Sequence, residues 1–105
     1  MTAPVTDPCG RLDLAHAEAW AAHVAVEQWL RDAVDRDTVD EARLKRVAAL
    51  LDRIEADGAF TTEELSLLAD LCRDRLAQST APTRDHSSLR AVIDAADEQH
   101  EVCTA

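Results

Sequence analysis

Apolar residues recur along the chain at alternating steps of three and four, the spacing that puts them on one side of an α-helix. The pattern predicts four helices, at residues 14–35, 39–57, 62–78 and 85–101. Thr38 and Glu41 have capping-box spacing and predict the start of the second helix. Residues 1–10 contain two prolines and a glycine and predict a flexible N-terminal lead-in. We therefore expect residues 11–105 to form a single all-α domain.

The turn between the second and third expected helices carries the clearest local signals. Gly58 suits the left-handed position just past a helix C-terminus. Thr61 and Glu64 have capping-box spacing, and Phe60 and Leu65 occupy the flanking hydrophobic-staple positions. The sequence therefore predicts a small four-helix domain built around an antiparallel helical hairpin, with the first and fourth helices packed across it.

Two of the expected helices carry apolar residues away from their main apolar stripes. On the third helix these are Leu67 and Leu71, so that helix is apolar on two sides and is the expected central element. On the first helix they are Trp20 and Val24. These four residues are candidate interface residues, facing a second copy or another protein. The alternative is that other helices of the same chain cover them.

The balance of charge is strongly acidic. The formal net charge is −10, and the eleven basic residues are ten Arg and one Lys. Near 1 M salt the Debye length falls to about 3 Å, so a large negative charge causes little self-repulsion. We therefore expect a halophilic source; the alternative is an ordinary acidic cytosolic protein. The charge opposes binding to nucleic acid or anionic membranes, because phosphate contacts need a basic surface. The second helix holds the candidate basic patch, Arg43, Lys45, Arg46 and Arg53.

Cysteine usage and hydropathy bear on the compartment. Cys9, Cys72 and Cys103 contain no C-x-x-C pair, and their odd number favours reduced thiols over a disulfide scaffold. No signal-peptide pattern opens the chain, and no apolar run approaches the length of a transmembrane helix. We therefore expect a cytoplasmic protein that has no contact with membranes.

The strongest candidate for site chemistry lies on the first helix. His16, Trp20, His23 and Glu27 follow one another at steps of four, three and four. His23 and Glu27, one turn apart, can face one metal ion, and His16 can contribute from two turns away. The structural alternative is that Trp20 packs against another helix with His23 hydrogen-bonded beside it. Metal sites on helices usually draw ligands from facing helices, and the sequence offers no second ligand pair.

Other patterns do not favour catalysis. Cys72 lies among leucines of a helix, where burial would keep the thiol protonated. His86, Ser87 and Ser88 are adjacent on a helix and so point apart, unlike a catalytic triad. Two glycines are too few for a phosphate-binding loop. The sequence predicts no enzyme activity and no cofactor.

Three fragments together resemble a known group of proteins. They are Trp20–His23, the run Ala59–Leu65 and the run Ala81–Asp85, in this order and spacing. The chain resembles small uncharacterised helical proteins of haloarchaea over nearly all residues after Gly10. The group has no assigned activity, so the resemblance implies a helical fold and no catalytic residue. Cys9 and Cys103 look particular to this chain.

These patterns favour a non-enzymatic cytoplasmic protein-interaction or regulatory module of a halophile, with self-association as one mode of interaction. The partner would be a protein or a second copy of the chain. Two alternatives stay open: a metal-binding helical protein that uses His16, His23 and Glu27, and a nucleic-acid-associated regulator that uses the basic patch of the second helix.

Overall fold

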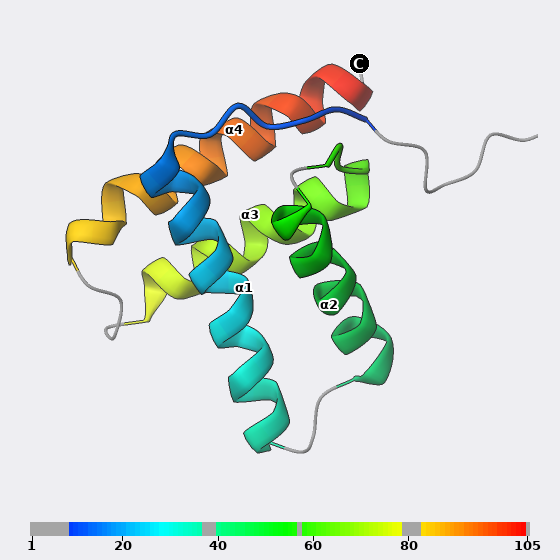
Figure 1. The fold of residues 1–105 in the computed structure, drawn as a ribbon, viewed down its shortest axis with the longest axis vertical. Helices are drawn as coiled ribbons and strands as arrows, with labels where there is room; N and C mark the ends of the chain where they lie inside the picture. The colour runs from blue at the N-terminus through cyan, green and yellow to red at the C-terminus, as the bar shows by residue number, and fades with distance from the viewer. Residues whose placement is uncertain (1–8, 37–39, 57, 79–82, 105) are drawn as a thin grey trace, which may run out of the picture.

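The computed structural model describes residues 9–36, 40–56, 58–78 and 83–104 (Figure 1). These residues form four α-helices, α1 (His16–Arg36), α2 (Glu41–Glu55), α3 (Thr62–Ala77) and α4 (His86–Thr104). A short 3-10 helix, η1 (Thr83–Asp85), leads into α4. The prediction of a small all-α four-helix domain is confirmed, and α4 extends one turn beyond its expected end at Glu101.

The helices are arranged as two antiparallel pairs (Figure 1). The helix α2 returns beside α1, and α4 returns beside α3, which crosses the first pair. Both α1 and α3 touch each of the other three helices, whereas α2 and α3 touch each other over a short stretch only. The turn at Gly58 leads α3 away from α2 and across α1, so the two helices joined by this turn meet near the turn only.

The core is mostly aliphatic, with small residues on α1 and large ones on α3. Ala21, Ala22 and Ala25 are buried on α1, so its backbone can approach its neighbours closely. The largest fully buried side chains are Leu50, Leu65, Leu68, Leu71 and Leu89, three of them from α3. None of the helices in the described part of the chain is long and apolar enough to cross a membrane.

The ends of the helices test the expected caps. At α3, the Thr61 hydroxyl accepts from the Glu64 amide at 3.1 Å, and the Glu64 carboxylate accepts from the Thr61 amide at 2.9 Å. This capping box is confirmed. At α2 the cap is Asp40, whose carboxylate accepts from the Ala42 amide at 3.2 Å. Glu41 is thus the first residue of α2, and the expected Thr38 lies outside the described residues.

Gly58 has a different role from the one expected. Its backbone is not in the left-handed region, and its amide donates to the Arg53 carbonyl at 3.2 Å. This hydrogen bond spans six residues, from Arg53 to Gly58. Gly58 therefore lies two positions beyond Ala56, the residue that caps α2, whereas the prediction put it one position beyond the cap. Asp57, the residue between them, lies outside the described residues. Phe60 and Leu65, the two staple residues, are both buried in the core.

The segment before α1 is fastened to the domain at Cys9 and Gly10. The Phe60 amide donates to the Gly10 carbonyl at 2.8 Å, and the Cys9 amide donates to the Phe60 carbonyl at 2.6 Å. The expectation of a flexible lead-in is therefore wrong for these two residues. Residues 1–8 lie outside the described part of the chain.

A disulfide joins Cys9 to Cys103, with the two Cα atoms 5.9 Å apart. The expectation of reduced thiols is wrong for this pair. Nothing in a sequence separation of 94 residues indicates proximity, but the segment before α1 runs along α4 (Figure 1) and brings the two sulfurs together. Reduced thiols therefore no longer support a cytoplasmic location for this protein.

Candidate binding groove between α2 and α3

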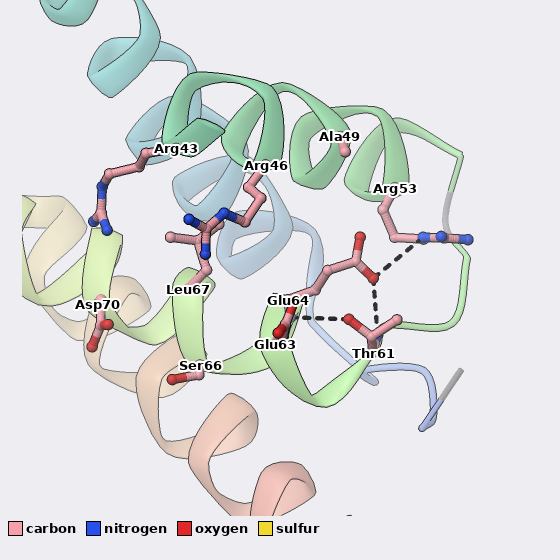
Figure 2. A pocket seen from close by; sticks show the side chains of 10 residues that line it. All are labelled: Arg43, Arg46, Ala49, Arg53, Thr61, Glu63, Glu64, Ser66, Leu67 and Asp70. Carbon is pink, nitrogen blue, oxygen red and sulfur yellow. Dashed lines mark hydrogen bonds and ion pairs between the residues drawn. The ribbon is translucent and has the colours of Figure 1, made fainter. Parts of the chain in front are cut away.

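The helices α2 and α3 diverge from their shared turn and leave a groove of about 420 Å³ between them (Figure 2). Its volume lies within the roughly 300–1,000 Å³ that ligand sites usually occupy. The ten lining residues come from these two helices and from the cap of α3: Arg43, Arg46, Ala49, Arg53, Thr61, Glu63, Glu64, Ser66, Leu67 and Asp70. We refer to this feature as the α2–α3 groove.

One wall of the groove is a row of arginines on α2. Residues 43, 46 and 53 fall on one side of the helix because steps of three and seven return to nearly the same direction. The Arg43 guanidinium lies 5.5 Å from the centre of the Trp29 ring, in a cation–π contact. The Arg46 Nε donates to the Ala42 carbonyl at 3.4 Å. Both guanidinium groups extend from α2 toward the groove (Figure 2).

The other wall is formed by α3 and its cap. Glu64 is held in place by the capping box and lies 3.6 Å from the Arg53 Nε. Asp70 lies 3.5 Å from Arg73, one turn further along α3. Leu67 packs against the core and contributes the apolar part of the lining. The groove thus combines an apolar base, a basic wall and an acidic wall.

The basic patch predicted on α2 is therefore split in the structure. Arg43, Arg46 and Arg53 line the α2–α3 groove, while Lys45 lies 3.7 Å from Glu41 on the exposed side of α2. The sequence identified the arginines but not the α3 wall that faces them. That wall depends on the angle between two helices, for which the local sequence contains no signal.

The expected metal ligands do not come together. His16 is exposed at the start of α1. The two ring nitrogens of His23 lie 3.5 Å from different carboxylates, Nδ1 from Glu27 and Nε2 from Glu55 on α2. Within the described ranges, no group of three His, Cys, Asp or Glu side chains has a geometry that can hold a metal ion. The expected site at His16, His23 and Glu27 is therefore not formed, and His23 instead links α1 to α2.

The four expected interface residues separate into different environments. Leu71 is buried, 2 % exposed, within its own chain, so its assignment to an interface is wrong. Val24 is half-buried on α1, and Leu67 lines the α2–α3 groove. Trp20 is 62 % exposed and stacks on His23 with the ring centres 5.8 Å apart. Of the four, Leu67 and Trp20 thus remain candidates for contact with another molecule.

The environment of Cys72 does not suit a nucleophile. Its side chain is fully buried on α3. Burial raises the pKa of the Cys72 thiol to about 12, and the neighbouring Arg73 offsets only part of this effect. A thiol of this pKa is almost fully protonated near neutral pH.

Fold and groove together define a small all-α domain with an open groove between two of its four helices. A family model matches residues 12–97, and the chain belongs to that family, DUF7853, a family of unknown function. The matched range contains the whole α2–α3 groove and excludes both cysteines of the disulfide. No curated protein and no solved structure matches the chain.

Proposed function

We propose that this protein is a non-enzymatic interaction module, and that the α2–α3 groove is the surface that binds its partner. The observation that carries this proposal is the divergence of α2 from α3, which leaves Leu67 accessible between two charged walls. An apolar base with a charged rim is the usual composition of a protein-binding surface. A protein partner or a second copy of this chain can occupy such a groove.

Several properties of the chain support a binding role rather than catalysis. Cys72 is protonated and buried, and the Glu64 carboxylate is engaged by Thr61 and Arg53. The excess of acidic residues and the resemblance to haloarchaeal proteins support a halophilic source. We therefore place the proposed interaction at high salt, where the apolar contact at Leu67 is less sensitive to screening than isolated surface charges are.

The proposal can be tested by photo-crosslinking from inside the groove. A photoreactive amino acid replaces Ala49, which lines the groove, and a control variant carries it at Ala48, which is exposed on α2 outside the groove lining. The two positions are adjacent, so expression, helix and salt conditions are matched. Crosslinking is carried out in cells of the native source, and each adduct is mapped to its residues by mass spectrometry.

We expect the Ala49 variant to give one adduct that maps to a single partner segment or to a second copy of the chain, and the Ala48 variant not to give it. The same adducts from both positions, or none from Ala49, would contradict the proposal. Sedimentation velocity of the purified protein at molar salt then distinguishes the two occupants, because only self-association changes the sedimentation coefficient with protein concentration.

One observation favours a second function, binding to a nucleic acid. Arg43, Arg46 and Arg53 lie in one row on α2, as side chains that contact successive phosphates do. The acidic wall of the groove opposes this function, because a phosphate backbone that follows all three arginines has to pass Glu63 and Glu64 near the turn. Nucleic acid is therefore included as a competing ligand in the experiment below.

A further inference from the structure

The two ends of the α2–α3 groove differ in how many of their charges are already paired. At the end near the turn, Arg53, Glu64 and Thr61 interact with one another (Figure 2). At the other end lie Arg43, Arg46, Leu67 and Asp70. Among the described residues, neither Arg43 nor Arg46 has a carboxylate within ion-pair distance. The net charge of the chain is −10. Two guanidinium groups without a carboxylate partner, beside one accessible leucine, therefore form a locally basic site on an acidic protein.

The acidic residues nearest this end do not neutralise it. Asp70 lies 3.5 Å from the Arg73 guanidinium, which also contacts Asp97 of α4. Asp70 is therefore paired within its own helix, with a cation that is not part of the groove lining. Glu63 is exposed one turn away from Leu67, toward the turn. The unpaired charge at the Arg43 end is thus positive.

We propose that the Arg43 end of the groove binds an acidic amphipathic helix of a partner protein. The carboxylates of that helix pair with Arg43 and Arg46, and an apolar side chain on the same face packs on Leu67. This inference rests on the proposed function and specifies the chemistry of the partner. Binding of a helix in a groove between two others is a common mode of recognition between proteins.

The spacing of the two arginines fits such a helix. Arg43 and Arg46 are one turn apart on α2, which places their Cβ atoms about 5–6 Å apart. Carboxylates at positions i and i+4 of a helix have about the same separation, and a leucine at i+3 lies on the same face. An extended strand would direct successive side chains to opposite faces and would bring fewer of them to the groove.

The probe for the test is a synthetic helical peptide with Glu at positions i and i+4 and Leu at i+3 and i+7. A second peptide replaces the two Glu by Gln and leaves the apolar residues in place. A short DNA duplex serves as the competing polyanion. Binding is measured by the anisotropy of a dye on the peptide, at a salt concentration where circular dichroism shows the protein to be helical.

Trp29 reports the place of binding. The protein has two tryptophans, so Trp20→Phe leaves Trp29, beneath Arg43, as the single source of tryptophan fluorescence. A carboxylate that draws the Arg43 guanidinium off the ring should change that emission. The protein variants are Arg46→Gln and the double variant Arg43→Gln/Arg46→Gln, with Arg90→Gln on α4 as the matched control. Arg46→Gln is informative alone, because its contact with the Ala42 carbonyl is local to α2.

We expect the acidic peptide to bind, to change Trp29 emission, and to bind about tenfold more weakly to Arg46→Gln and weaker still to the double variant. Arg90→Gln should bind as the parent does, and the Gln peptide should bind at least tenfold more weakly to the parent. Equal binding of both peptides, or unchanged affinity in both groove variants, would overturn the inference. So would DNA that binds the groove more tightly than the acidic peptide. If crosslinking from Ala49 succeeds but the acidic peptide does not bind as expected, the proposed interaction module is retained and only the acidic helix as its partner is refuted.

Discussion

The disulfide between Cys9 and Cys103 leads to a large and specific effect of reduction on stability. The bridge closes a loop of 94 residues, nearly the whole chain. In the chain-entropy model, opening a loop of about that length costs roughly 4.7 kcal/mol, and measured values for native disulfides are about 2–5 kcal/mol. Next to the bridge, Cys9 and Gly10 hydrogen-bond to Phe60, and we expect reduction to weaken these bonds as well. We expect reduction to lower the free energy of unfolding by about 3–5 kcal/mol, a large share of the roughly 5–15 kcal/mol typical of a small domain.

The assay is urea or guanidinium unfolding followed by circular dichroism, with and without reductant, at one fixed salt concentration. Cys9→Ser and Cys103→Ser should each reproduce the effect of reduction, and the double variant should be no less stable than either one, because a single bond is lost in all three. Reductant should not change the unfolding midpoint of Cys103→Ser. Equal midpoints for the oxidised and reduced parent would refute the reasoning. So would an intact mass showing that the purified, air-exposed protein carries three free thiols.

Three further predictions follow from the caps and the core. Thr61→Ala should lower the free energy of unfolding by about 1 kcal/mol, since it removes the acceptor for the Glu64 amide; an unchanged denaturation midpoint would contradict the capping role. Leu71→Ala should lower the free energy of unfolding by about 2–5 kcal/mol, whereas Val102→Ala, at a position that is 65 % exposed, should lower it by under about 0.5 kcal/mol. Similar losses of stability for both variants would contradict the burial of Leu71. The Cys72 thiol should resist alkylation in the folded protein up to about pH 10, and stability should fall as pH rises from about 9 toward 12, because only the unfolded state then loses that proton; rapid alkylation of the native protein at pH 8 would contradict its raised pKa.

Features decided by neighbouring residues could be predicted from the sequence. The capping box of Thr61 and Glu64 needs only a spacing of three, and it forms as expected. The start of α2 was missed by two residues because Asp40 and Thr38 both qualify as caps, and the choice between them depends on where the preceding chain turns. Helix number and class follow from apolar periodicity, which acts over one or two turns.

Features decided by helix packing could not be predicted. Leu71 looked surplus to its own apolar stripe, but α3 packs against both α1 and α4 and the side chain is buried. Cys9 and Cys103 meet because the segment before α1 follows α4, and no local pattern records that path. The α2–α3 groove likewise arises from an angle between helices, although its arginines were visible as a patch.

The central claim is that the α2–α3 groove binds an acidic helix of a partner protein. Backbone amide chemical shifts of the labelled protein, followed during titration with the acidic helical peptide, test that claim most directly. The account predicts shifts that cluster on residues 43–53 of α2 and 63–70 of α3 and that disappear in Arg43→Gln/Arg46→Gln. Shifts centred instead on the exposed Trp20 surface of α1, or spread over the molecule and unchanged in that variant, would contradict it.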